Sequence, residues 1–115
     1  MDVETFRKLL NSTDKIILLK FYADWCSPCN NIKELCNDRF SRFPPTIKVI
    51  EINIDETINL YVTLKRYKMI KSIPSLMIWY PQKDRDHWYV PDQSISTSNK
   101  EEIICFLNNI DKKTM

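Results

Sequence analysis

The sequence predicts an α/β fold, in which helices cover both faces of a mixed β-sheet. Residues 15–23 form an almost wholly apolar run, which is typical of a strand buried on both faces at the centre of a sheet. Helix-like and strand-like segments alternate along the chain before a closing hairpin. Alternation of this kind favours parallel strands joined by helices, with an antiparallel pair at the end.

Each element is predicted from periodicity and from its boundary residues. Apolar residues at helical spacing predict a first helix ending near Asn11, a second of about four turns beginning at Cys26, a third capped by Asp55, and a last one behind Ser98. Pro44 ends the second helix, because proline cannot continue it. The last helix has its apolar stripe at Ile103, Phe106, Leu107 and Ile110. The expected strands are residues 15–23, 47–54, 75–80 and 87–90.

Length and composition exclude several classes of protein. A chain of 115 residues with 43% apolar and 28% charged residues fits one folded domain over residues 1–115. The net charge of +2, without a basic run, argues against a nucleic-acid partner. No apolar run approaches the ~18–20 residues that span a bilayer, so no membrane association is expected. Charged residues within the first ten positions do not fit a signal peptide, and a cytoplasmic protein is expected.

The chain contains no glycine and four cysteines. Positions with a left-handed backbone must therefore be taken by Asn, by Asp or by a strained residue. Four cysteines are few for a secreted disulfide framework of this size. The cysteines are instead interpreted one by one.

Cys26 and Cys29 frame Ser27 and Pro28 directly after the central strand. A helix beginning at Cys26 directs unpaired N–H groups and its positive dipole end at that sulfur, which favours the nucleophilic thiolate. Cys29 lies three residues further on the same helical face and can close a small disulfide ring. Pro28 falls in the first turn, where a missing N–H is tolerated.

Two other interpretations of this pair remain open. A Cys-x-x-Cys pair can be half of a zinc site, for which Cys36, Cys105 and His87 are the further candidate ligands. None of these three forms a second closely spaced pair. The two thiols can also be purely structural. Cys36 lies on an apolar stripe and is interpreted as a core thiol, whereas Cys105 lies off its stripe and is expected to be partly exposed.

The segment Phe-Tyr-Ala-Asp-Trp-Cys-Ser-Pro-Cys resembles the active-site segment of the thioredoxin family. The resemblance extends to Asn53-Ile54-Asp55 after the second core strand, to Ile73-Pro74-Ser75 before the third, and to the closing helix. The family's first strand, which precedes the first helix, is not expected here. The resemblance therefore implies a thioredoxin-like fold with a mixed four-stranded sheet.

The resemblance also implies roles for individual residues. Cys26 matches the attacking thiol, Cys29 the resolving thiol and Trp25 the exposed aromatic beside them. Pro74 matches the family's cis-proline, and the backbone of Ile73 is expected to pair with an extended substrate segment. The expected substrate-binding residues are Trp25, Ser27, Pro28, Ile73, Pro74 and Ser96, with Ile95 and Ser96 forming the second wall of the groove.

Some positions depart from the family pattern. The family has a buried Asp where Lys20 stands and its Lys partner where Glu51 stands, so an ion pair of reversed polarity is expected. Glu51 is then a candidate proton acceptor for Cys29, and Lys20 a candidate thiolate stabiliser that makes the disulfide more oxidising. Ser27 replaces a glycine, and Asn30 replaces a frequent lysine.

The function expected from the resemblance is thiol–disulfide exchange, with the dithiol acting as a reductant of protein disulfides. No cofactor is expected, because the cysteine pair carries the electrons. The expected partners are disulfide-containing proteins and a thioredoxin reductase or another dithiol donor, and the chain is expected to be a monomer. An oxidant or isomerase and a non-catalytic docking subunit are the alternatives.

Overall fold

A computed structural model describes the backbone of residues 1–114 and the side chains of residues 1–110. Within these residues the strands form a mixed four-stranded sheet in the order β2-β1-β3-β4. The helices are α1 (Val3–Ser12), α2 (Ser27–Asn31), α3 (Lys33–Ser41), α4 (Asn59–Arg66) and α5 (Lys100–Thr114). The strands are β1 (Ile16–Tyr22), β2 (Ile47–Asn53), β3 (Ser75–Trp79) and β4 (Gln93–Ser96). The predicted fold class is confirmed.

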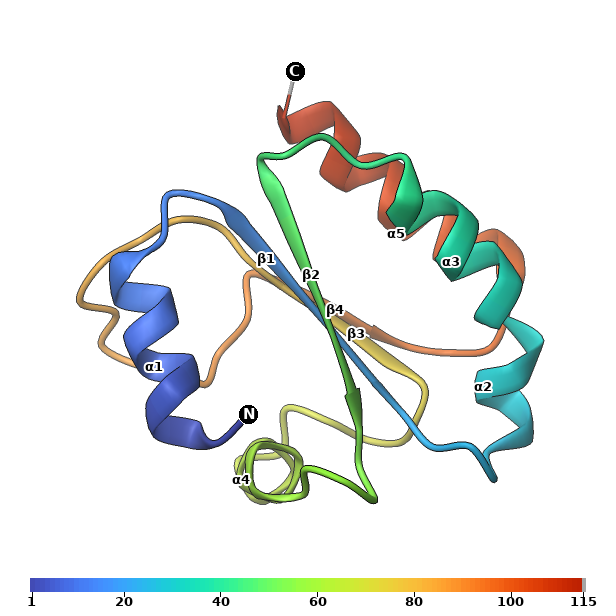
Figure 1. The fold of residues 1–115 in the computed structure, drawn as a ribbon, viewed down its shortest axis with the longest axis horizontal. Coiled ribbons are helices and arrows are strands. Elements are labelled where there is room, and N and C mark those ends of the chain that lie inside the picture. The colour runs from blue at the N-terminus through green and yellow to red at the C-terminus, as the bar shows by residue number, and fades with distance from the viewer. Residues whose placement is uncertain (115) are drawn as a thin grey trace.

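Strand β1 lies inside the sheet and explains the long apolar run. It pairs in parallel with β2 and antiparallel with β3, which in turn pairs antiparallel with β4. All residues of β1 except Tyr22 are buried. Helices α1 and α4 lie on one side of the sheet, and α2, α3 and α5 lie on the other (Figure 1).

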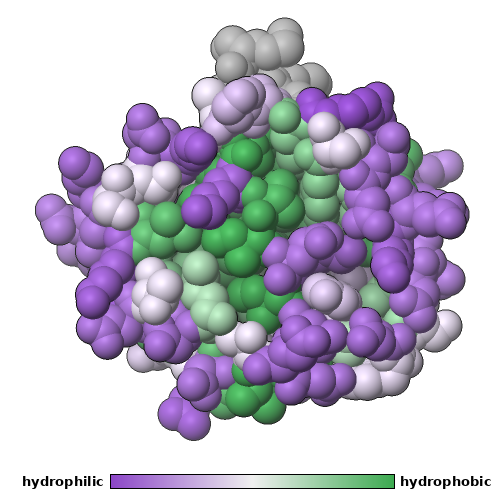
Figure 2. All heavy atoms as spheres, viewed as in Figure 1, coloured by the Kyte–Doolittle hydropathy of each residue, from purple (hydrophilic) through white to green (hydrophobic). Residues whose placement is uncertain are grey.

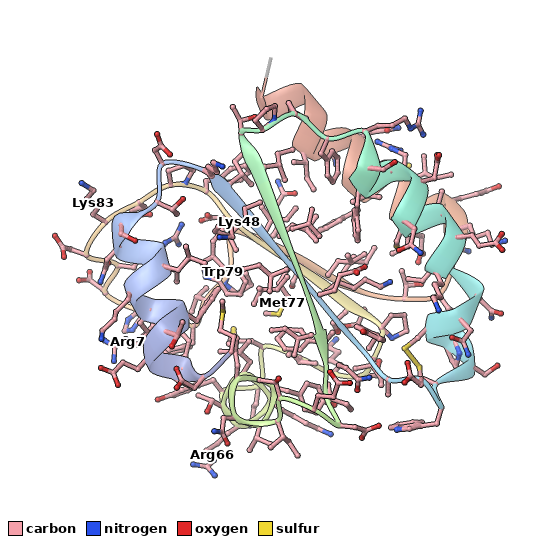
Figure 3. All side chains as sticks on the ribbon, in the orientation of Figure 1. Arg7, Lys48, Arg66, Met77, Trp79 and Lys83 are labelled. Atoms are coloured by element: carbon pink, nitrogen blue, oxygen red, sulfur yellow. A yellow bond between two sulfur atoms is a disulfide. The ribbon has the colours of Figure 1, made fainter. Side chains whose placement is uncertain are left out.

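Two apolar clusters fill the space between the sheet and these helices. Because side chains alternate along a strand, Ile17, Leu19 and Phe21 pack with the α1 and α4 side, whereas Ile16 and Leu18 pack with the α3 and α5 side. Trp79 and Met77 of β3 belong to the first cluster and point away from α3 and α5 (Figure 3). Figure 2 shows hydrophobic side chains along the middle of the face where the edge strand β2 runs, surrounded by hydrophilic ones.

The helix predicted to begin at Cys26 is divided into α2 and α3. The division falls at Ile32, whose φ and ψ are −109° and 2°. The Ile32 amide donates to the carbonyl of Cys29, three residues back, so the chain is overwound at this point. The apolar stripe is continuous across the break, because Ile32 and Cys36 are both fully buried. Spacing alone therefore could not reveal the interruption.

The strand predicted at residues 87–90 is wrong. Residues 86–89 form turns, and the fourth strand is β4. Trp88 lies outside the sheet and packs edge-on against Phe6 of α1, with ring centroids 6.2 Å apart. The indole N–H of Trp79 donates to the carbonyl of Trp88 at 2.9 Å. Trp88 therefore serves the packing against α1 and not strand pairing, whereas Trp79 remains in β3 as the register partner of Ile17.

Two predicted helix caps are also wrong. The helix expected behind Asp55 begins at Asn59, with Ile58 as its N-terminal cap. The last helix is capped by Asn99 rather than Ser98, because Asn99 Oδ1 accepts the backbone N–H of Glu102. Asp55 instead contacts a residue of the candidate site.

Candidate active site

Cys26 and Cys29 lie where the chain passes from β1 into α2. The two residues form a disulfide with their Cα atoms 5.2 Å apart, visible as the yellow bond beside α2 in Figure 3. Cys26 is the N-terminal cap of α2, and its Sγ accepts the backbone N–H of Cys29 at 3.2 Å. The same N–H can stabilise a thiolate on Cys26 after reduction, since hydrogen bonds to charged acceptors are the stronger ones.

The two cysteines are almost fully buried beneath an exposed aromatic side chain. Cys26 is 4% and Cys29 3% exposed, whereas the neighbouring Trp25 is 67% exposed. The Trp25 indole donates to Asp55 Oδ2 at 2.9 Å, which ties this side chain to the segment after β2. The sequence predicts Asp55 only as a helix cap, although Asp55 is part of the Asn53-Ile54-Asp55 segment that resembles the family. Sequence reasoning therefore missed its contact with the site.

The Ile73–Pro74 segment lies against the sulfur of Cys26. The Ile73–Pro74 peptide bond is cis, and the carbonyl oxygen of Ile73 lies 3.8 Å from Cys26 Sγ. Ser75 follows Pro74 and pairs with Ser96 across β3 and β4, with their hydroxyl oxygens 2.6 Å apart. Ser96 therefore lies beside the proline, although its hydroxyl is turned towards Ser75.

Lys20 and Glu51 are direct neighbours across β1 and β2. Their Cα atoms are register partners, and Lys20 Nζ lies 3.6 Å from Glu51 Oε1. The two side chains differ in exposure, which is 4% for Lys20 and 39% for Glu51. Lys20 Nζ also lies 5.5 Å from the centroid of the Tyr22 ring. The structure thus contains an ion pair with its positive member inside and its negative member at the surface.

A cavity of about 160 Å³ lies between this ion pair and Cys29. Lys20 and Glu51 form its wall on the sheet side, and Cys29 contributes from α2. The remaining lining residues are Tyr22, Asp24, Asn30, Lys33 and Asn37. Three residues singled out from the sequence, Lys20, Cys29 and Glu51, therefore share one polar cavity.

Tyr22, which lines this cavity, and Cys36, which is buried on the same side of the sheet, are held in their neutral forms. Burial raises the pKa of the Cys36 thiol, an effect that the positive charge of Lys20 opposes in part. Burial, followed by the charge of Glu51, raises the pKa of Tyr22. Both groups are therefore uncharged at neutral pH.

The other predicted residues lie in different places. Ser27 and Pro28 are exposed in the first turn of α2, and the side-chain amide of Asn30 donates to the carbonyl of Asp24.

The two remaining cysteines lie outside the disulfide. Cys36 is buried, and Cys105 is exposed on α5. Among the described residues no group of three or more His, Cys, Asp or Glu side chains could hold a metal ion. None of the helices within residues 1–114 has the length and hydropathy needed to cross a membrane.

A disulfide-forming Cys-x-x-Cys pair at the end of a central strand, capping a helix and packed against a cis-proline segment, defines a thiol–disulfide oxidoreductase. The family model described as thioredoxin matches residues 1–109. The chain therefore belongs to the thioredoxin family, and it has the protein-disulfide reductase activity that goes with its redox-capable cysteine pair.

Individual relatives agree with this assignment. A thioredoxin of Rickettsia conorii is 30% identical over 82 residues, which make up 71% of this chain and 74% of that protein. A thioredoxin of Thiocapsa roseopersicina is 39% identical over 62 residues, or 54% of this chain and 64% of that protein. Among solved structures, Plasmodium falciparum thioredoxin has a TM-score of 0.67 at 20% identity, covering 94% of this chain and 81% of that chain. At this identity the structural likeness shows the fold alone.

Proposed function

We propose that the chain reduces protein disulfides with Cys26 as the nucleophile and Cys29 as the resolving thiol. The Cys26 thiolate attacks one sulfur of a substrate disulfide, and the other substrate sulfur leaves with the electron pair and takes up a proton. Cys29 then attacks Cys26, which forms the Cys26–Cys29 bond and releases the second substrate thiol. Two electrons pass from the cysteine pair to the substrate. The contact between Cys26 Sγ and the Ile73 carbonyl, beside exposed Trp25, carries this proposal.

The substrate binds in an extended conformation across the surface above the disulfide. The backbone of Ile73 is the pairing site for this segment, by the principle of strand addition. Trp25 supplies an exposed aromatic face next to Cys26, and Pro74 and Ser96 contribute further contacts to the substrate segment. Ser27 and Pro28, exposed at the start of α2, contact the substrate residues that flank its disulfide.

Glu51 serves as the acceptor for the proton of Cys29. Its carboxylate lines the same cavity as Cys29 and is 39% exposed, so a proton can pass from the cavity to solvent. Water within the cavity would bridge the two groups, since the lining is polar and roomy enough to hold it.

The proposed setting is a reducing compartment, the cytoplasm, with the chain acting as a monomer. Cys105 is exposed on α5, and an exposed thiol of this kind stays reduced in a compartment where glutathione and similar thiols are abundant. A thioredoxin reductase or another dithiol donor returns the pair to its dithiol form. Cell fractionation and sedimentation of the purified protein test the compartment and the monomeric state.

Reduction of insulin disulfides, with dithiothreitol as electron donor, tests the proposed reaction. We expect turnover by the wild-type protein, none with Cys26→Ser, and trapping of a mixed disulfide with Cys29→Ser. Cys105→Ser, which removes a thiol far along the chain, is the matched control and should retain full turnover. Full turnover by Cys26→Ser would overturn the assignment, whereas wild-type protein without turnover but with intact partner complexes would indicate a docking subunit.

A further inference from the structure

The ammonium group of Lys20 is a buried charge in the wall of the cavity that reaches Cys29. The side chain is 4% exposed, and it comes from β1, the strand that leads into the cysteine pair. Burial disfavours the charged form of a lysine unless an opposite charge is nearby. Glu51 supplies one such charge at 3.6 Å from Lys20 Nζ. A negative charge arising at Cys29 would supply a second from across the cavity.

The two members of the ion pair do not act equally on thiols at this face of the sheet. Water screens the charge of Glu51, which is 39% exposed, far more than that of Lys20. Cys36 is buried on the same side of the sheet, and the positive charge of Lys20 opposes in part the rise in its pKa that burial causes. The pair therefore presents a net positive potential to sulfur atoms nearby.

Among residues 1–110, whose side chains the structure describes, few other charges face Cys29. Lys33 and Asp24 line the same cavity but are exposed at its rim, and they oppose one another in sign. Burial raises the pKa values of Tyr22 and Cys36, so both are neutral. Cys26, the closest sulfur, is bonded to another sulfur both in the disulfide and in the mixed disulfide with substrate. Lys20 is thus the dominant buried charge near Cys29.

We propose that Lys20 is a positioning residue for the resolving step, where it stabilises the thiolate of Cys29. This proposal rests on the function proposed above. After the mixed disulfide forms, Cys29 loses its proton through Glu51 to solvent, and Lys20 holds the resulting negative charge. The Cys29 thiolate attacks Cys26 Sγ, the bond between Cys26 and substrate breaks, and the substrate sulfur leaves with the electron pair. Mixed disulfides of this protein are consequently short-lived.

The pH midpoint for ionisation of Cys29 tests the proposal. In the Cys26→Ser background, which holds Cys29 as a thiol, iodoacetamide alkylation is followed at the Cys29 peptide by mass spectrometry across pH. Adding Lys20→Met should raise this midpoint by about one unit, a loss of about tenfold in thiolate at neutral pH. Lys20→Arg should restore the lower midpoint. Lys33→Met, the matched control that removes an exposed charge from the same cavity, should shift it less than half as far.

A second variant covers the case in which Lys20→Met does not fold. Replacing both Lys20 and Glu51 by Met leaves neither charge unpaired, and the Cys29 midpoint should still rise, because Lys20 has the larger effect. The equilibrium potential of the Cys26–Cys29 pair in this variant should become more negative, by about 30 mV for each tenfold change in the equilibrium constant.

An unchanged Cys29 midpoint in a folded Lys20 variant would overturn the proposal, as would a shift from Lys33→Met of half the Lys20→Met shift or more. The alkylation titrations of Cys29 do not depend on catalytic turnover by the protein. Insulin reduction by the wild-type protein tests the proposed function separately, so failure of one is distinguishable from failure of the other.

Discussion

The indole Nε1 of Trp25 donates a 2.9 Å hydrogen bond to Asp55, a residue 30 positions further along the chain. The bond fixes an exposed aromatic ring beside Cys26 from a separate segment. The loop holding Asp55 is itself ordered, because the Asp55 amide donates to Asn53 Oδ1 at 3.0 Å. The orientation of Trp25 thus depends on the segment that follows β2.

Replacing Asp55 by Ala should weaken the binding of protein substrates. A hydrogen bond of this kind contributes about 0.5–1.5 kcal/mol, so we expect kcat/KM for insulin to fall by up to about tenfold. The potential of the cysteine pair should not change, since neither sulfur contacts Asp55. Glu56→Ala, an exposed neighbour, is the control. Unaltered kinetics with Asp55→Ala would show that the orientation of Trp25 does not matter to binding.

Replacing Lys68 by Gly should stabilise the protein. Lys68 follows α4 with a φ of 63°, a left-handed conformation that costs a residue with a Cβ atom about 1–2 kcal/mol. Glycine adopts it freely but loses more backbone entropy on folding, so the free energy of unfolding should rise by about 0.5–1 kcal/mol. Urea denaturation measures the change. Lys65→Gly, within α4, should have the opposite effect of about −1 kcal/mol; parallel losses in both variants would refute the argument.

Removal of Asp92 should destabilise the connection between β3 and β4. Asp92 Oδ2 accepts from Arg85 at 2.7 Å and from the Tyr80 amide at 2.6 Å, and the Arg85 side chain is only 9% exposed. Asp92→Ala leaves a largely buried guanidinium without its carboxylate partner, although it still donates to the Tyr80 carbonyl at 2.7 Å. We therefore expect a loss of about 3 kcal/mol in the free energy of unfolding.

The exposed ion pair of α3 provides the comparison. Arg42 and Asp38 lie 2.6 Å apart, but their side chains are 65% and 64% exposed. Asp38→Ala should therefore cost about 0.5 kcal/mol or less in the same urea titration. If both Asp variants lose the same stability, burial does not govern the strength of these pairs.

The stability of the fold should decline in alkaline solution because of Cys36. Burial raises the pKa of this thiol above its ordinary value. The folded state therefore holds the proton more tightly than the unfolded state does. The associated stability is fully present below the ordinary thiol pKa of about 8.5 and is lost as the pH rises through the folded pKa.

Urea titrations from neutral pH to about pH 10 measure this loss, which Cys36→Ala should reduce. The substitution also removes a buried sulfur, so only the slope against pH is compared and not the absolute stability. A slope identical in the two proteins would show that Cys36 is not the responsible group.

Much of the fold follows from local sequence patterns. The apolar run 15–23 predicts an inner strand, and β1 is that strand, because a strand covered on both faces buries consecutive side chains. The stripe Ile103, Phe106, Leu107 and Ile110 is buried on α5 as its helical spacing predicts. The break at Ile32 and the position of β4 were missed, because both depend on packing between distant segments.

The Cys-x-x-Cys spacing by itself determined the disulfide-capable pair, since three residues suffice to bring two thiols together at the start of a helix. The resemblance to thioredoxins, and not the spacing, pointed to Lys20 and Glu51. Only the tertiary structure decided that Lys20 is buried, that Glu51 reaches solvent and that both share a cavity with Cys29. It also joined Trp25 to Asp55. The electrostatic effect of Lys20 and Glu51 on Cys29 depends on how deeply each side chain is buried and on the pairing of β1 with β2. Both arise only when segments far apart in the chain pack together.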